Sequence, residues 1–471
     1  MVCGFLFVAA LGPTAAPGQA PSRARFDTRV LTHEPDPGFV SLTLVAPDRT
    51  IFGGTFFSAA GNAGDSTPSR VFAWSPAGQL LRTYTITGQD TSANHGVQVA
   101  AQDGAGDLYV LDVTPARVLV LDPRTGAQRT YATIPHVPPC GPAVSSDCKR
   151  TNADQAPEPD YAAFGPDGSL YVTDDTQGSV FRVPPGGGRA QVWFTDPQLD
   201  GVTFGPTGLV LAPDHKTLLL TTAASNPATI NPPSAGALYA LPIQPDGSPG
   251  KLRRVWTSGA RDGPDGFALS LAGNIYMALI GPGVNQIIEL SPDGKVLART
   301  PDPVSNMNMA VPYDTPSSVQ FDGERLIVTN DSFFAGTRSH QVLFDVFAGE
   351  PGAPIFRPSM AVTQTLVGAG AGPASARHGR ARLLLTVSPR HVTVGRLVHL
   401  HIRGVVLRAG ARTPAAGARL RLAGRVWRLN RAGRLTLVRR FARPHLVRLR
   451  VTEPGVASGR AFMRVRHRRR G

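Results

Sequence analysis

Residues 263–300 read GPDGFALSLAGNIYMALIGPGVNQIIELSPDGKVLART, and this stretch decides the fold. Short apolar runs alternate with turn sequences such as LAGN and SPDGK. Gly, Pro, Asn and Asp supply the backbone conformations of tight turns, and only short strands fit between the turns. The stretch therefore predicts four antiparallel strands joined by tight connections.

The same unit of strand, turn, strand, loop, strand, turn, strand occurs six times along residues 30–360. The turn between the first two strands of each copy reads, in order, APDRT, QDGAGD, GPDGS, APDHK, LAGN and DGER. The second hairpin of each copy comes after the loop, the last one in QVLFDVFAGEPG, and the repeat is about 55 residues long. The period-two alternation excludes helical repeats. The chain is therefore predicted to be all-β, with a six-bladed β-propeller around a central channel.

Four stretches carry a family resemblance, namely PTGLVLAPDHKTLLLTT, GPDGFALSLAGNIYMAL, NQIIELSPDGKVL and PSSVQFDGERLIVTN. They resemble the regucalcin, gluconolactonase and luciferin-regenerating-enzyme superfamily, and the resemblance extends over residues 38–358. It implies a divalent metal ion at the channel mouth, Ca²⁺ or another such as Zn²⁺ or Mn²⁺. It also implies hydrolysis of a lactone or related ester.

Each innermost strand is predicted to bring one residue to the channel mouth, about six positions before its turn. Six positions form this ring, Ser41, His95, Asp160, Thr207, Asp265 and Ser317. The second position is open, because QVAAQDGAGD carries an insertion that would place Gln98 there instead of His95. A convergent ring of oxygen ligands suits a hard cation such as Ca²⁺.

The resemblance assigns roles to four ring residues. The family holds its metal with a Glu, an Asn and an Asp, and a further Asn contacts substrate. Asp265 falls on the metal Asp, Thr207 on the metal Asn, Ser41 on the Glu, and Asp160 on the substrate-side Asn. Hydroxyl groups thus replace two of the three ligands, and hydroxyls are poorer ligands for a hard cation than carboxylates. Asp160 is expected to compensate as a fourth ligand, and the alternative for Asp265 is a turn-capping carboxylate.

Two functions remain open at this stage. The first is a divalent-metal-dependent lactone or ester hydrolase in which Asp160 or His95 takes a proton from water. The second is a non-catalytic envelope protein whose propeller binds a ligand or partner. No G-x-S-x-G elbow or phosphate-binding loop is present. The acids of VTDD at 172–175 and of TND at 329–331 are interpreted as turn residues on the outer side of the blades.

The last hundred residues differ sharply in charge from the rest. Residues 371–471 contain 25 arginines, no lysine and one acid, Glu453, whereas the other 370 residues contain 23 basic and 32 acidic side chains. After a flexible linker at 361–380, alternating apolar and basic residues predict an Arg-rich β-sandwich of about seven strands over 381–471. It resembles the immunoglobulin-like or carboxypeptidase-regulatory-like modules of bacterial surface proteins.

This basic segment predicts an anionic partner, for which we expect a cell-envelope polymer or lipid. Nucleic acid is not expected, because Trp427 is nearly alone as a platform for stacking bases. The alternative is compositional, since arginine outnumbers lysine throughout the chain. A monomer is expected.

The N-terminus and the cysteines together predict export. Residues 1–20 resemble a secretory signal peptide without its basic start, so we expect a secreted or envelope-associated bacterial protein. Cys140 and Cys148 flank a short loop, and such a pair forms a disulfide in an oxidising compartment. No other stretch reaches the length of a transmembrane helix.

Overall fold

The structure, a computed structural model, describes residues 23–359 apart from 36–37, 57–66, 141–147, 149–154, 202–203 and 226–228. It also describes residues 382–466 apart from gaps of one or two residues. The chain folds as two compact units, Met1–Gln364 and Thr365–Gly471. The predicted signal peptide at 1–20 and linker at 361–380 lie outside the described residues.

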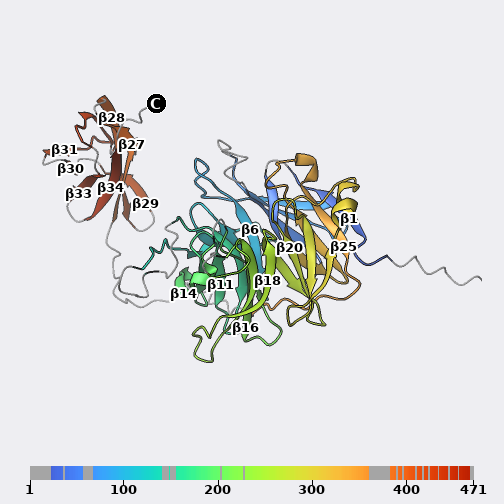
Figure 1. The fold of residues 1–471 in the computed structure, drawn as a ribbon. Coiled ribbons are helices and arrows are strands. Elements are labelled where there is room, and N and C mark those ends of the chain that lie inside the picture. The colour runs from blue at the N-terminus through green and yellow to red at the C-terminus, as the bar shows by residue number, and fades with distance from the viewer. Residues whose placement is uncertain are drawn as a thin grey trace, which may run out of the picture. The chain divides into compact units, whose positions relative to one another are not determined.

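The first unit is a six-bladed β-propeller, as predicted, and each blade is built on four antiparallel strands (Figure 1). Blade 1 comprises β2 (Phe39–Val45), β3 (Ile51–Phe56), β4 (Arg70–Trp74) and β5 (Leu80–Thr85). Blade 2 comprises β6 (Val97–Gln102), β7 (Leu108–Asp112), β8 (Arg117–Leu121) and β9 (Gln128–Thr133), with the short β13 (Gly188–Arg189) at its edge. Blade 3 comprises β10 (Pro159–Phe164), β11 (Leu170–Asp174), β12 (Ser179–Val183) and β14 (Gln191–Thr195).

The remaining blades follow the same order from the channel outward. Blade 4 comprises β15 (Pro206–Leu211), β16 (Thr217–Thr222), β17 (Ala235–Pro242) and β18 (Arg253–Ala260). Blade 5 comprises β19 (Pro264–Leu269), β20 (Ile275–Leu279), β21 (Gln286–Leu290) and β22 (Val296–Thr300). Blade 6 comprises β23 (Pro316–Asp322), β24 (Arg325–Asn330), β25 (Val342–Phe347) and β1 (Thr28–His33). The connections include three short helices, η1 (Pro197–Leu199), α1 (Pro303–Met307) and η2 (Arg338–His340).

Blade 6 takes its outer strand from the opposite end of the sequence. The repeat pattern predicts a hairpin that ends in FAGEPG, but β1 pairs antiparallel with β25 instead. Arg23, just before β1, donates to Asp345 Oδ1 at 2.7 Å. The two ends of the propeller therefore meet in one sheet, which closes the ring without leaving an unpaired inner edge.

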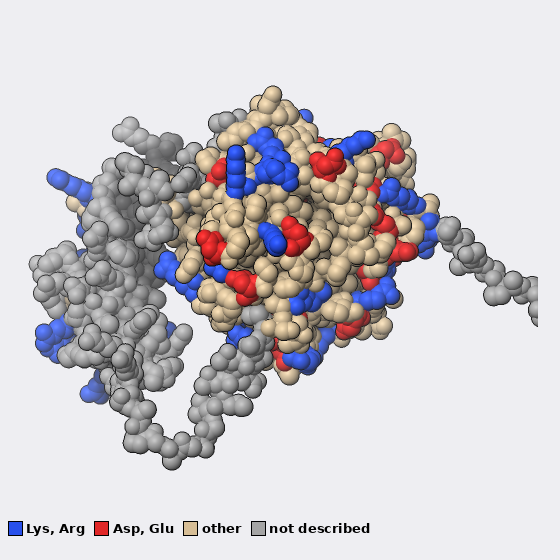
Figure 2. All heavy atoms as spheres, turned by 90° about the horizontal axis from the view of Figure 1, so that it is seen from below, with Lys and Arg blue, Asp and Glu red and all other residues tan. Residues whose placement is uncertain are grey.

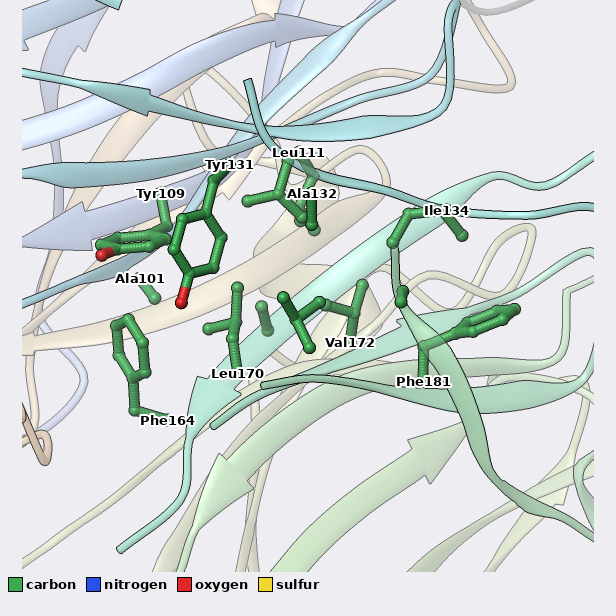
Figure 3. Close-up of a cluster of buried hydrophobic side chains, with 14 of the residues drawn as sticks. Ala101, Tyr109, Leu111, Tyr131, Ala132, Ile134, Phe164, Leu170, Val172 and Phe181 are labelled. Carbon is green, nitrogen blue, oxygen red and sulfur yellow. The ribbon is translucent and has the colours of Figure 1, made fainter. Parts of the chain in front are cut away.

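The core lies between neighbouring blades. Figure 3 shows the cluster between blades 2 and 3, in which Tyr109 packs edge-to-face against Tyr131 and Phe164 with ring centroids 5.0 and 4.8 Å apart. Corresponding clusters fill each of the other five inter-blade spaces. Because both faces of most blades are buried in this way, their inner strands are apolar on both sides, as in YVTD and IYMAL.

The two ends of the channel differ. Residues 351–358 run across one end, where Ala353 N donates to Leu269 O of blade 5 at 2.8 Å. Farther along, Gly104 N of blade 2 donates to Pro358 O at 2.8 Å. A cavity of about 80 Å³ lies beneath residues 351–358. The first residues of the innermost strands face the other end, which carries the candidate site described below.

The predicted disulfide is present, with the sulfur atoms of Cys140 and Cys148 bonded to each other. Basic and acidic side chains are interspersed over the propeller face in view in Figure 2, so this face carries no broad field of one sign. No described helix has the length and apolar character that crossing a membrane requires.

The second unit consists of small β-sheets. Nine strands are described, β26 (Arg382–Ser388), β27 (His391–Thr393), β28 (Leu397–Arg408), β29 (Ala411–Pro414), β30 (Arg419–Leu422), β31 (Arg425–Arg428), β32 (Arg434–Arg440), β33 (Leu446–Glu453) and β34 (Val456–Arg466). The long strand β34 pairs with β26 and β27 on one side and with β33 on the other. One buried cluster includes Leu400, Leu420 and Leu437. The module family of this unit stays a prediction.

Candidate functional site at the channel mouth

Local irregularities in the innermost strands aim the ring residues. In five blades the pairing register shifts at an equivalent place, between Val40 and Thr43, Pro159 and Ala162, Pro206 and Leu209, Pro264 and Phe267, and Pro316 and Val319. A bulge turns the extra residue out of the regular ladder and re-aims its side chain. The bulges contain five of the predicted ring residues, Ser41, Asp160, Thr207, Asp265 and Ser317.

These five residues line one cavity of about 220 Å³ at the mouth. The sixth ring position belongs to Gln98, because the register of β6 shifts later, between Val99 and Ala101. Both ring nitrogens of His95 face backbone carbonyls, at 2.9 Å from Ala93 O and 2.8 Å from Thr67 O. Gln98 therefore replaces His95 in the ring, and a catalytic role for His95 stays a prediction.

Threonines of the second strands hold the ring in place. Thr173 Oγ1 donates to Thr207 O of the next blade at 2.7 Å, and Thr221 Oγ1 donates to Asp265 O at 2.9 Å. Thr329 Oγ1 of blade 6 donates in the same way to Ser41 O of blade 1 at 3.2 Å, and Ser317 Oγ donates to the same oxygen at 2.8 Å. Each bond joins one blade to its neighbour, so the ring is fixed by the same contacts that close the propeller.

Five carboxylates line the cavity, Glu158, Asp160, Asp175, Asp265 and Asp331. The interpretation of Asp175 and Asp331 as outer turn residues is wrong. The second strand of each blade runs antiparallel to the first, so its last residues return to the mouth. Asp174, immediately before Asp175, pairs with Pro159 at the start of β10. The strand-end patterns VTDD and TND, combined with this register, were the available signal.

Several polar atoms at this site are buried without a partner. Asp265 and Asp331 are 7% and 2% exposed, and the Oδ1 atom of each accepts no hydrogen bond from the described residues. The same holds for Oε1 of Gln98, whose Nε2 donates to Asp160 Oδ1 at 2.9 Å. An unsatisfied buried acceptor costs about 1–3 kcal/mol, and more if it is charged. Such a concentration of unsatisfied acceptors indicates a site built for a donor or a cation.

Burial raises the pKa of every carboxyl group that lines the cavity. Burial, followed by the charge of nearby Asp174, raises the pKa of Glu158 to about 7. For Asp160, burial raises the pKa to about 7, although the hydrogen bond from Gln98 opposes the shift. Burial and then neighbouring carboxylates raise the pKa of Asp175 and of Asp265 well above the usual range. The charged forms of these acids are therefore poorly stabilised by the protein itself.

Burial also raises the pKa of Asp331 well above its usual range, and the charge of Glu34 adds to the shift. Glu34 lies behind the cavity, where its Oε2 accepts from Val40 N at 2.9 Å and burial raises its pKa to about 8. None of the described residues that line the cavity is Lys, Arg or His. A bound cation would supply the missing positive charge.

The types of oxygen donor in the cavity fit a hard cation. Carboxylate, hydroxyl and amide oxygens are the ligands that Ca²⁺ takes, and they make up the polar lining. No three Asp, Glu, His or Cys side chains among the described residues are grouped closely enough to hold a metal ion. The predicted site needs only two carboxylates, those of Asp265 and Asp160. Its other ligands are the hydroxyls of Thr207 and Ser41. The unpartnered Oδ1 of Asp265 provides one free ligand.

Phenylalanines surround the acids, a feature that the sequence analysis missed. Five of them line the cavity, Phe39, Phe56, Phe204, Phe333 and Phe334. Phe39 contacts Phe56 and Phe333 with ring centroids 6.0 and 5.9 Å apart, and Phe333 contacts Phe204 at 6.1 Å. The mouth thus combines a negative floor with an aromatic rim. We call these five residues the phenylalanine rim.

Comparison with known proteins gives one family match. Residues 162–329 match the model of the SMP-30/Gluconolactonase/LRE-like region. A search of curated proteins gives no match. The matched residues extend from β10 to β24 and include Thr207 and Asp265, whereas Ser41, Asp160 and Asp331 lie outside them.

Solved structures of similar fold share little sequence with the chain. Regucalcin from Agrobacterium tumefaciens, titled a calcium-binding protein, is 16% identical, with 71% of this chain and 97% of that chain covered and a TM-score of 0.47. Luciferin-regenerating enzyme is 12% identical over 68% of this chain and 96% of that chain, with a TM-score of 0.44. Virginiamycin B lyase from Staphylococcus aureus is 13% identical, with 68% of this chain and 99% of that chain covered and a TM-score of 0.44. Residues 162–329 thus match an SMP-30/Gluconolactonase/LRE-like region, carried by a six-bladed β-propeller.

Proposed function

We propose that the mouth cavity binds a divalent cation, Ca²⁺ in the first instance, and hydrolyses a lactone or related ester. The observation that carries this proposal is the unpartnered Oδ1 atoms of Asp265 and Asp331, in a cavity whose described lining contains five acids and no basic residue. The family description of residues 162–329 supports a lactone as the substrate class.

Asp265 and Asp160 would hold the cation, with the hydroxyls of Thr207 and Ser41 as further ligands. When bound, a divalent ion polarises a carbonyl group and lowers the pKa of a water molecule. Thr221 keeps the backbone of Asp265 in position through its hydrogen bond to the carbonyl oxygen, so the ligand does not depend on a loop. The phenylalanine rim would limit the access of bulk water.

Asp160 is the proposed general base. The Gln98 amide donates to its Oδ1 and so orients the carboxylate that would accept the proton. Asp160 takes a proton as water adds to the carbonyl carbon. It returns the proton to the ring oxygen as the carbon–oxygen bond of the lactone breaks. The products are a hydroxy acid and the regenerated carboxylate.

The test is hydrolysis of a panel of lactones and aryl esters, followed by proton release with and without Ca²⁺, Mn²⁺ or Zn²⁺. We expect activity that requires a divalent ion, falls at least 100-fold in Asp265→Asn and Asp160→Asn, and is unchanged in Asp246→Asn. Asp246 is a suitable control because its carboxylate caps an exposed turn by accepting from Ser248. Equal rates in all four proteins would contradict the proposal.

A second proposal concerns the C-terminal unit, for which we propose binding to an anionic envelope polymer or lipid after export. Arg419 and Arg428 lie directly opposite each other on β30 and β31, and both are exposed. Like charges at such cross-strand positions are destabilising, and a polyanion would relieve the repulsion. This proposal is compatible with a catalytic or a purely binding propeller.

A further inference from the structure

The mouth cavity offers more carboxyl groups than one divalent ion needs. Five of them line it, and the charge of Glu34 acts on Asp331. Asp265 and Asp160 would serve the ion, which leaves Asp331 with an unpartnered Oδ1 and 2% exposure beside Phe333 in the chain. This free carboxyl oxygen is therefore available to a second positive group.

The rim indicates what carries that group. All five rim residues are phenylalanines, which offer negative ring faces but no hydrogen-bond donors. A cation within about 6 Å of such a ring face is attracted by the ring quadrupole, and apolar parts of a ligand gain from burial against the same rings. We propose that the ligand of this site is a small apolar molecule that bears a positively charged amine. This inference rests on the proposed function, because it takes the same cavity as the site.

The lining disfavours the other ligand classes. A polyhydroxylated ligand needs side chains that donate as well as accept, and two donors of the lining are already engaged, because Gln98 Nε2 donates to Asp160 Oδ1 and Ser317 Oγ donates to Ser41 O. An anionic ligand would be repelled by the acids. Typical pockets for drug-sized ligands measure about 300–1,000 Å³, so a cavity of about 220 Å³ suits a compact molecule with one ring.

The experiment compares three probes of nearly equal shape by calorimetry on the full chain, with saturating Ca²⁺ and after chelation. The probes are 2-phenylethylammonium, neutral 2-phenylethanol and anionic 3-phenylpropionate. We expect the ammonium to bind at least tenfold more tightly than the alcohol and the carboxylate not to bind. Rising salt should weaken ammonium binding.

Two substitutions separate the two parts of the site. Asp331→Asn, which keeps the shape of the side chain, should remove most of the preference for the ammonium over the alcohol. Phe333→Leu should weaken ammonium binding about 2- to 30-fold, the range expected for loss of one cation–π contact. Phe356→Leu is the control, because Phe356 lines the cavity at the opposite end of the channel. It should leave binding unchanged.

The outcomes separate this inference from the proposed function. If Ca²⁺ binds but the ammonium binds no more tightly than the alcohol, the inference is overturned and the metal site stands. If the ammonium binds as expected while Ca²⁺ does not, the inference stands and the metal-dependent reaction fails. If neither binds, both are overturned. If Phe356→Leu weakens binding as much as Phe333→Leu, the site is elsewhere and the inference is again overturned.

Discussion

Asp160→Asn should stabilise the propeller at alkaline pH, in contrast to most substitutions of buried polar residues. The folded-state pKa of Asp160 is raised to about 7 from 3.8, so the native state holds its proton more tightly than the unfolded state does. The contribution of the Asp160 carboxyl group to the free energy of unfolding is therefore fully present below about pH 4. It is lost as the pH rises through about 7. Asparagine cannot ionise, and its Oδ1 can still accept from Gln98 Nε2.

The magnitude follows from the shift. Each pKa unit is equivalent to 1.36 kcal/mol, so the difference between about 7 and 3.8 limits the gain in unfolding free energy of Asp160→Asn to about 4 kcal/mol at pH 8. The Asp160 side chain is only partly buried in the folded protein, and solvent in the cavity screens it, so we expect about 2–3 kcal/mol. For a domain of this size that gain corresponds to a rise in Tm of about 3–4 °C.

The assay is thermal unfolding after chelation at a series of pH values from 4 to 8. Wild type should lose stability across this range, Asp160→Asn should lose less, and the two should agree at pH 4. The exposed turn variant Asp246→Asn should follow wild type throughout. A variant that is destabilised equally at pH 4 and pH 8 would refute the reasoning, because it would show that the carboxylate contributes through contacts rather than through unfavourable ionisation.

Three further predictions concern the scaffold and the second unit. Replacing Cys140 and Cys148 by Ser should lower the free energy of unfolding in denaturant by about 2–3 kcal/mol, because the disulfide no longer restricts the unfolded chain. A reductant should destabilise wild type and leave this variant unchanged. Gly266→Ala should cost about 1–3 kcal/mol in the same assay, because an added Cβ would overlap the Tyr161 hydroxyl; unchanged stability would contradict this packing. Protein lacking residues 365–471 should retain its melting transition but lose salt-sensitive retention on anionic vesicles, and equal retention would contradict the binding proposed for the second unit.

The sequence predicts the scaffold well because the propeller is a repeat. Gly, Asp and Pro turns that recur about every 55 residues indicate six blades, and the position of Asp265 relative to its turn places it at the mouth. The ring position of blade 2 was left open between His95 and Gln98, since one inserted residue moves the bulge and only the register of β6 decides between them. The closure of blade 6 by β1 depends on contacts between residues more than 300 apart, which local patterns do not encode.

The charge of the site was underestimated for a similar reason. Asp175 and Asp331 have the same local signature as turn acids, and the alternation of strand directions, not residue type, brings them to the mouth. The phenylalanine rim comes from loops and strand ends of several blades, so no single stretch of sequence displays it. Residues assembled from distant segments are the part of a site that a single sequence predicts least.

Equilibrium binding of Ca²⁺ to the chelator-treated protein tests the central claim most directly, namely that the acids at the mouth hold a cation. We predict one calorimetric site, with a gain in stability of about 2.7 kcal/mol at a hundredfold excess over Kd. Asp265→Asn should weaken binding at least tenfold, and Asp246→Asn should bind as wild type does. The absence of binding heat and of any Tm shift with Ca²⁺, Mn²⁺ or Zn²⁺, or equal binding by Asp265→Asn, would contradict the account.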